Sequence, residues 1–440
     1  MNILDEKTSQ THDQESPLLP KTRENVQEIN GASFLGAVFN LSTTIIGAGV
    51  MALPAIMKVL GLGLGIGMIV LVAVLTEFSL EILLRFSKAA KEESYGGVMG
   101  DAFGVSGRRV LQGFVMLNIL GVLIVYTIII GDVLSGTSAS GAHHSGVFEG
   151  WFGSHWWTGR TFVLLFVTLS VFAPLACFKR MDSLRFTSAL AFALAVFFLV
   201  ITGGITLYKL VDGGVCMPRI LPNITDITSF WNLFTVFPIL VTAFICHVNI
   251  HTIENELKDS SLIQPVVRTS VALCSTVYIL TSLFGILLFG DSTLDNVLTN
   301  FDTNLGVPYN NVLNDVIRIS YALHLILVFP VVFHPLRLNL DGLLFPSARP
   351  LSSDNRRFTL ISIALISVIF LGATFIPSIW VAFQFTGATS SNAIGFIFPA
   401  AVVLRDRHLV ASKKDKIVSG FMIFLALFSS FVAIYSIQMH

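Results

Sequence analysis

Three small residues, Gly47, Ala48 and Gly49, interrupt an apolar stretch, FNLSTTIIGAGVMALP, that extends from Phe39 to Pro54. If a helix unwinds at these residues, the helix that follows them begins with backbone N–H groups that have no partner inside the helix. The positive end of the helix dipole strengthens the attraction of these groups for a negative charge. The stretch is therefore a candidate site for binding a carboxylate through the main chain.

The rest of the sequence is that of an integral membrane protein. Of its 440 residues, 54% are hydrophobic and only 12% are charged, and the mean hydropathy is +0.78. A helix crosses a bilayer core of about 30 Å with roughly 20 apolar residues, whereas barrel strands are shorter and alternate in polarity. We therefore predict an all-α membrane protein. Its eleven transmembrane helices are predicted at approximately 33–58, 61–85, 110–134, 161–178, 184–208, 230–251, 267–290, 316–336, 358–380, 385–404 and 417–437.

The positions of the basic residues predict the orientation of the chain. If the N-terminus is cytosolic, all but five of the 27 Lys and Arg residues fall on the cytosolic side, as the positive-inside rule requires. The C-terminus then lies outside the cytosol. The sequon that begins at Asn223 falls in a non-cytosolic loop and is a candidate glycosylation site. The polar residues 1–30 are predicted to form a disordered cytosolic tail.

The interrupted first span has two interpretations. Small residues also permit close packing of helices, but an unwound backbone in hydrocarbon persists only where protein or a polar cavity surrounds it. The sixth span favours a binding site because Pro238 and a polar cluster interrupt it as well. Paired interrupted helices at matching positions of two five-helix halves predict an inverted-repeat transporter with one additional helix. The polar cluster of the sixth span comprises Thr242, Cys246, His247, Asn249 and His251.

Four segments of the chain resemble the amino acid/auxin permease family, and the similarity covers about residues 30–437. Within that family the chain is most similar to plant vacuolar amino acid transporters, and more distantly to animal sodium-coupled neutral amino acid transporters. The resemblance implies a leucine-transporter-like 5+5 inverted repeat with discontinuous helices 1 and 6, formed by a transporter domain at 31–440. The four segments are FNLSTTIIGAGVMALP, VYTIIIGDVLS, KRMDSLRFTSALA and AFICHVNIHTIENEL.

The family resemblance also implies an activity and a set of substrate-binding residues. It implies that neutral or acidic amino acids are carried across the vacuolar membrane by alternating access, driven by a cation gradient. The substrate carboxylate is expected at the three small residues of the first span. The substrate ammonium is expected at backbone carbonyls near Phe244, Cys246 and His247, and Tyr126 is expected to close one side of the site.

The coupling cation is predicted from the first and eighth spans. Sodium-coupled relatives use a polar residue that matches Asn40, here followed by Thr43, together with hydroxyls just before a proline of the eighth span. In this chain the residues at 326–329, before Pro330, carry no hydroxyl. Because Na⁺ prefers oxygen ligands, a proton is favoured over sodium. His324 is the candidate proton carrier, and the alternative is a neutral histidine hydrogen-bonded to a neighbouring helix.

The sequence does not favour an enzyme. His247 and His251 have the spacing of a zinc protease helix, but Val248 occupies the position of the glutamate that such an enzyme requires. We expect no cofactor, metal or nucleic acid partner. The expected partners are an amino acid, a coupling cation and the lipid bilayer, and the protein is expected to be a monomer. Two alternatives remain open: an amino acid sensor of the same fold without net transport, and a sodium-coupled importer of the plasma membrane.

Overall fold

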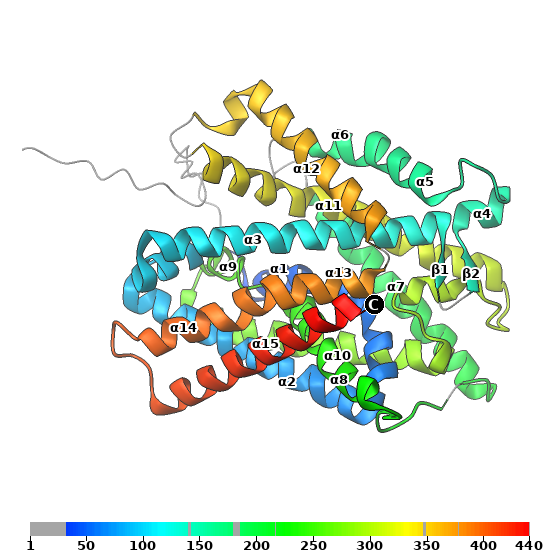
Figure 1. Ribbon diagram of the computed structural model, residues 1–440, viewed down its shortest axis with the longest axis horizontal. Coiled ribbons are helices and arrows are strands. Elements are labelled where there is room, and N and C mark those ends of the chain that lie inside the picture. Colours follow the sequence, from blue (N-terminus) through cyan, green and yellow to red (C-terminus); the bar gives the residue numbers. More distant parts are fainter. Residues whose placement is uncertain are drawn as a thin grey trace, which may run out of the picture.

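The computed structural model describes residues 32–139, 142–178, 185–215, 217–345, 349–376 and 378–439. The predicted cytosolic tail, residues 1–30, therefore lies outside the described residues. The described chain is almost entirely helical, and most of its helices run along one direction (Figure 1). The strands β1 (Gly136–Ala139) and β2 (Ala142–Ser145) lie at one end of the bundle, which we call the hairpin end. The turn at Lys91 and the connection at Asp406 lie at the opposite end, which we call the basic end.

The described residues contain nine helical stretches that are long and apolar enough to cross a membrane, and two shorter apolar ones, Phe34–Ile45 and Arg160–Ala176. Helix is found in every one of the predicted ranges. The long helices are α2 (Leu53–Ala90), α3 (Tyr95–Ser135), α7 (Arg185–Val211), α8 (Ile227–Phe244), α10 (Ile263–Phe289), α11 (Asn310–Leu344), α12 (Asn355–Phe375) and α15 (Lys413–Met439). The shorter α-helices are α1 (Phe34–Ile45), α4 (Val147–Phe152), α5 (Arg160–Val167), α6 (Ala173–Ala176), α9 (Ile250–Glu256), α13 (Ile379–Thr386) and α14 (Phe398–Arg405).

Several 3₁₀ and π segments complete these helices or connect them. The tenth predicted span is one continuous helical stretch in which two π-helical turns, η8 and η9, separate α13 from α14. The fourth span likewise contains a π-helical turn, η2, between α5 and α6. These segments are η1 (Ala48–Ala52), η2 (Thr168–Phe172), η4 (Ser260–Leu262), η5 (Gly290–Ser292), η6 (Val297–Asp302), η7 (Leu351–Ser353), η8 (Gly387–Ser391) and η9 (Ala393–Ile397).

The first predicted span is interrupted, one residue earlier than the sequence indicated. The helix α1 ends at Ile45, and the backbone leaves the helical conformation at Ile46 and Gly47. The N–H of Val50 already donates to the carbonyl of Gly47 at 3.2 Å, which starts the 3₁₀ turn of η1. Of the three small residues, only Gly47 is therefore unwound. Ala48 and Gly49 form the start of the second helical segment.

The sixth predicted span is interrupted within its polar cluster. The helix α8 runs through Pro238 and ends at Phe244, and α9 begins at Ile250. The prediction that Pro238 takes part in the interruption is therefore wrong. Proline is tolerated inside membrane helices where neighbouring groups compensate for its missing N–H. Here the π-helical segment η8 packs directly on this turn, because a Cβ on Gly387 would lie 2.3 Å from the Pro238 carbonyl oxygen.

The boundary between the first two predicted spans is a kink inside α2. Gly61 has φ +72° and ψ 165°, a conformation that only glycine adopts without strain. The kink frees two backbone amides from helical hydrogen bonding. The N–H of Leu62 donates to the carbonyl of Arg219 at 2.8 Å, and the N–H of Gly63 donates to that of Ile220 at 2.9 Å. The connection between α7 and α8 thus satisfies the backbone groups at the start of the second span.

The hairpin of β1 and β2 was not predicted, so the all-α expectation is wrong in this detail. The two strands pair antiparallel from Gly136 opposite Ser145 to Ala139 opposite Ala142. The ring Nδ1 of His144 lies 3.0 Å from a carboxylate oxygen of Asp302 in η6. This contact holds the hairpin against the connection between α10 and α11.

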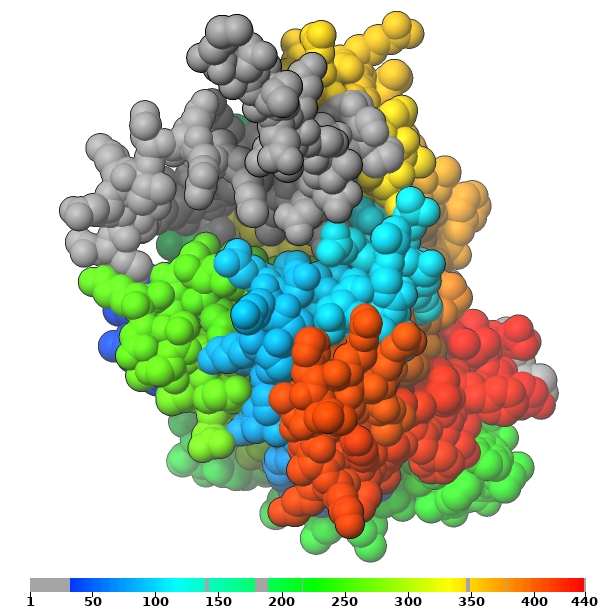
Figure 2. All heavy atoms as spheres, turned by 90° about the vertical axis from the view of Figure 1, so that its left-hand side faces the viewer, coloured from blue at the N-terminus to red at the C-terminus, as the bar shows by residue number. Residues whose placement is uncertain are grey.

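Ion pairs join separate elements at the basic end. Arg85 of α2 pairs with Asp415 of α15 at 2.8 Å, and Lys88 of α2 pairs with Glu254 of α9 at 3.4 Å. Figure 2 shows this end of the molecule, where the α2–α3 turn, α9 and the α14–α15 connection lie next to one another. In the bundle behind it, α10 packs on α2, and α11 packs on both α3 and α7.

The contact between η8 and α8 predicts that alanine is poorly tolerated at Gly387. The substitution Gly387→Ala places a methyl group against the backbone of Pro238, and overpacking of this kind costs about 1–3 kcal/mol. The apparent Tm of the purified protein in detergent should fall clearly. Gly113→Ala in α3 is the matched control, because a Cβ there meets no atom within 4 Å. Equal Tm values for the two variants would contradict the close contact.

Candidate functional site

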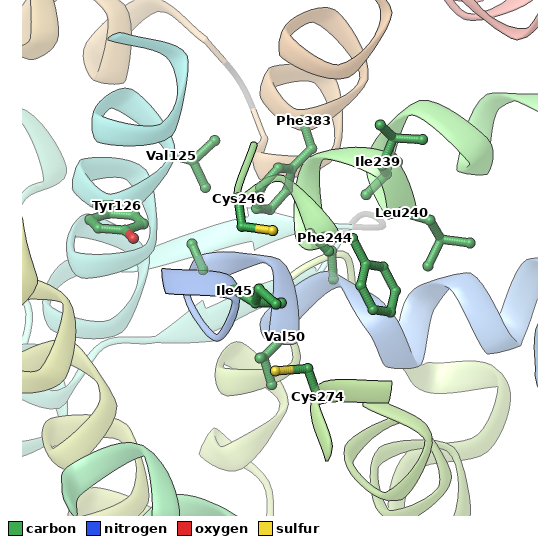
Figure 3. Close-up of a cluster of buried hydrophobic side chains, with 14 of the residues drawn as sticks. Ile45, Val50, Val125, Tyr126, Ile239, Leu240, Phe244, Cys246, Cys274 and Phe383 are labelled. Atoms are coloured by element: carbon green, nitrogen blue, oxygen red, sulfur yellow. The ribbon is translucent and has the colours of Figure 1, made fainter. Parts of the chain in front are cut away.

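The two interruptions meet inside the protein. A Cβ on Gly49 would lie 2.7 Å from the Cβ of Ala243 and 2.9 Å from its Cα. The backbone at the start of η1 is therefore in direct contact with the end of α8. Ala48, Ala243 and Phe244 are buried. Figure 3 shows η1 passing beside the end of α8, with Val50 and Cys246 in the same cluster of buried side chains. Only a glycine at position 49 allows this approach.

The hydroxyl of Tyr278 lies between the two ends. This buried residue of α10 has its oxygen 2.8 Å from the carbonyl oxygen of Ile45 and 2.6 Å from that of Ala243. Each carbonyl belongs to the last turn of an interrupted helix, where the N–H group four residues later is no longer placed to donate a hydrogen bond to it. The hydroxyl has one proton, so it donates to one carbonyl at a time and the two helix ends share it.

A second tyrosine holds the unwound residue itself. The hydroxyl of Tyr321, in α11, donates to the carbonyl of Gly47 at 2.8 Å. The predicted substrate residue Tyr126 faces the same residue from α3, because a Cβ on Gly47 would lie 3.0 Å from the Tyr126 hydroxyl oxygen. The structure therefore brings Gly47 and Tyr126 together, next to the first N–H groups of η1.

The predicted residues of the sixth span have different surroundings. The ring of Phe244 packs edge-on against Tyr278, with 4.9 Å between the ring centroids. The carbonyl of Cys246 already accepts the N–H of Asn249 at 3.0 Å. The Nε2 of His247 lies 3.0 Å from the hydroxyl oxygen of Ser79 in α2. The side chain of His247 is thus held by α2, and it makes no hydrogen bond to Gly47 in the described part of the chain.

The predicted cation residues are not gathered at one point. Asn40 is exposed on α1, and the hydroxyls of Thr43 and Thr44 donate to its carbonyl at 2.9 and 3.0 Å. His324 is buried in α11, and its Nδ1 lies 2.7 Å from the carbonyl oxygen of Ala191 in α7. Because a carbonyl only accepts, Nδ1 carries a proton. No hydrogen bond among the described residues joins His324 to Asn40 or Thr43.

His324 nevertheless lies next to the interruption of the first helix. Its ring packs against that of Tyr321, with 4.9 Å between the centroids, and Tyr321 in turn donates to Gly47. The Nε2 of His324 is buried and has no hydrogen-bond partner in the described residues. The contact with Ala191 fits the alternative of a hydrogen-bonded neutral histidine. The path through Tyr321 is what connects this ring to the candidate site.

The two buried tyrosines, Tyr278 and Tyr321, and a polar contact with the tenth span were not predicted from the sequence. The Nδ2 of Asn118, in α3, donates to the hydroxyl of Ser391 at 2.7 Å, and the hydroxyl of Thr242 lies 2.9 Å from the same oxygen. A usable signal was present for the tyrosines. A phenol hydroxyl in the middle of an apolar span needs a buried partner, and the chain has only 7 Tyr.

The candidate glycosylation site lies away from this cluster. Asn223 is exposed in the connection between α7 and α8, at the hairpin end. The N–H groups of η1, the shared hydroxyl of Tyr278 and the Gly47 contacts instead lie in the interior of the helix bundle. A helical membrane protein with two interrupted helices in contact at its centre has the architecture of a transporter.

Comparisons with known proteins identify the family. The sequence pattern of the family described as "Transmembrane amino acid transporter protein" matches residues 30–440, and the chain belongs to this family. It is 65% identical to "Amino acid transporter AVT6A" of Arabidopsis thaliana over 97% of this chain and 93% of that protein. It is 62% identical to "Amino acid transporter AVT6B" of the same plant, over 99% of this chain and 97% of that protein.

More distant similarities agree with this assignment. The chain is 27% identical to "Sodium-coupled neutral amino acid symporter 2" of Danio rerio over 85% of this chain and 75% of that protein. A crystal structure of a manganese transporter mutant from Eremococcus coleocola matches with a TM-score of 0.54 at 11% identity. It covers 92% of this chain and 88% of that one. This likeness shows the fold alone. The protein is a helical membrane transporter of a family whose members are not enzymes.

The shared hydroxyl predicts the effect of Tyr278→Phe. Removing it leaves the buried carbonyls of Ile45 and Ala243 without this donor, and an unsatisfied buried polar group costs about 1–3 kcal/mol. We expect a lower apparent Tm and at least roughly tenfold slower amino acid uptake in reconstituted vesicles. Tyr208→Phe is the control, since Tyr208 is exposed. Wild-type uptake by the Tyr278 variant would show that the two helix ends do not depend on this hydroxyl.

Proposed function

We propose that this protein is a secondary active amino acid transporter that works by alternating access. The proposed domain, residues 31–440, has eleven transmembrane helices in a 5+5 inverted repeat plus one additional helix. One observation carries the proposal: two interrupted helices meet at backbone distance, Gly49 on Ala243, and share the hydroxyl of Tyr278. Interrupted helices in contact at mid-depth are how transporters of this architecture bind substrate.

The proposed substrate is a neutral or acidic amino acid. Its carboxylate binds the N-terminal N–H groups of η1, at Ala48 and Gly49, beside the hydroxyl of Tyr126. Its ammonium binds backbone carbonyls of the interruption between Phe244 and His247. The buried hydrophobic side chains around the interruptions include Tyr126, Phe244 and Cys246 (Figure 3).

The proposed coupling ion is a proton carried by His324. A change of charge on this ring acts on Tyr321, which it contacts, and through that hydroxyl on the carbonyl of Gly47. The side chains at 326–329 in α11 offer no oxygen to a sodium ion. The sodium-coupled relative from zebrafish makes sodium the alternative ion, with Asn40 and Thr43 as its ligands.

The proposed location is the vacuolar membrane, with the plasma membrane as the alternative. It rests on the resemblance to plant vacuolar amino acid transporters and on the concentration of Lys and Arg at the basic end, which faces the cytosol in this arrangement. The hairpin end and Asn223 then face the lumen. Because the vacuole lumen is acidic, proton symport exports amino acids to the cytosol. The proposed functional unit is a monomer.

Uptake by the purified full-length protein in vesicles tests the function. Radiolabelled L-alanine and L-glutamate should accumulate when a pH gradient is imposed, and replacing Na⁺ by choline should leave the rate unchanged. Binding of either amino acid without accumulation would instead indicate a sensor. Uptake that requires Na⁺ at every pH would indicate the sodium-coupled alternative.

His324→Gln tests the coupling. Glutamine can still donate to the Ala191 carbonyl but cannot take up a proton, so uptake should lose its stimulation by the pH gradient. Exchange of labelled for unlabelled amino acid should continue, because exchange moves no net protons. His155→Gln, in the hairpin-end connection between α4 and α5, is the control. Unchanged pH stimulation in the His324 variant would assign coupling to another group.

A further inference from the structure

A cavity lies on the same interrupted helices, at the hairpin end. Its volume is about 570 Å³, within the range of roughly 300–1,000 Å³ that small-molecule sites occupy. It is lined by the start of α2, by α8, by α13 and by α15. Ala55 and Thr235, which line it, each lie roughly two helical turns from an interruption. The cavity is therefore separate from the contact of Gly49 with Ala243, but it shares helices with it.

The cavity contains one positive and one negative side chain, Lys58 and Asp295, whose charges act on each other without a direct ion pair. The ammonium of Lys58 donates to the carbonyl of Thr293 at 2.9 Å, and no ion pair joins Lys58 to Asp295 in the described residues. Asp295 is exposed, and the side chain of Ser378 donates a hydrogen bond to its carboxylate. Each charged group keeps hydrogen-bonding capacity that its neighbours do not use.

This pair of charges selects a class of ligand. An anion alone would meet Asp295, and a cation alone would meet Lys58, so each would face a like charge. A zwitterion can present its carboxylate to the ammonium and its own ammonium to the carboxylate, and such charge-assisted hydrogen bonds are about twice as strong as neutral ones. The buried amide of Gln384 and the ring of Trp380 complete the lining.

We propose that this cavity is an outer binding site for the amino acid, occupied before the substrate reaches the interruptions. Lys58 binds the α-carboxylate and Asp295 binds the α-ammonium. The inference rests on the proposed function, because it assigns the same substrate to a second position. It predicts two amino acids bound per chain, one at the interruptions and one in this cavity.

Three variants test the outer site in different ways. Lys58→Met and Asp295→Asn each remove one charge, and Val381→Trp fills the cavity without changing any charge. Lys209→Met and Asp212→Asn are the controls, because they make the same charge changes at the hairpin end outside the cavity. Binding of radiolabelled L-alanine and L-glutamate to the purified full-length protein gives the stoichiometry. Uptake into vesicles in which the hairpin end of the protein faces the added amino acid gives KM.

The wild type and both controls should bind two molecules of the transported amino acid per chain, and the three cavity variants should bind one. KM for uptake from the hairpin end should rise by about tenfold in Lys58→Met and Asp295→Asn, the effect of losing one charged hydrogen bond. A wild-type protein that transports but binds a single molecule would overturn the outer site and leave the transporter proposal intact. Two molecules bound by folded Lys58 and Val381 variants would also overturn it. No uptake by the wild type would instead contradict the proposed function itself.

Discussion

The structure depends on satisfying backbone groups that two interrupted helices expose inside a membrane protein. Each unpaired group costs several kcal/mol in hydrocarbon, and no water is available there to take its place. The hydroxyl of Tyr278 contacts carbonyls from both interrupted helices, and the hydroxyl of Tyr321 donates to Gly47, the unwound residue of the first one. The helices α10 and α11 thus supply the donors that stabilise the interruptions. This constraint ties together four helices that are distant in sequence.

Because the Tyr278 hydroxyl has one proton for two carbonyl acceptors, the hydrogen bonding of one helix end depends on that of the other. When Tyr278 donates to Ile45, the Ala243 carbonyl needs another donor, and the reverse holds for Ile45. A substrate ammonium is one donor that can fill this role at the sixth-span end. The contact of Gly49 with Ala243 leaves little space for independent movement, so the two helix ends are expected to move together. Tyr321 extends the same linkage to His324.

The helical segments and the first interruption could be predicted from the sequence. Long apolar runs need no partner to be recognised as membrane helices, and the small residues at 47–49 marked an interruption correctly to within one residue. Pro238 was misleading because membrane helices tolerate proline, and α8 continues through it to Phe244. The role of Tyr278 was equally hidden, since its two acceptors come from other helices. The hairpin at Gly136–Ser145 was missed because polar residues in a loop show no helical or apolar pattern.

The kink at Gly61 has a consequence for how the protein can be observed. The connection that caps it at Arg219 and Ile220 is the same one that carries the exposed Asn223. We therefore expect a movement of the segment that follows the first interruption to displace this surface loop as well. A fluorescent label attached to this loop would report the movement of a buried helix from the water-exposed surface. An antibody bound to the loop would slow the same movement.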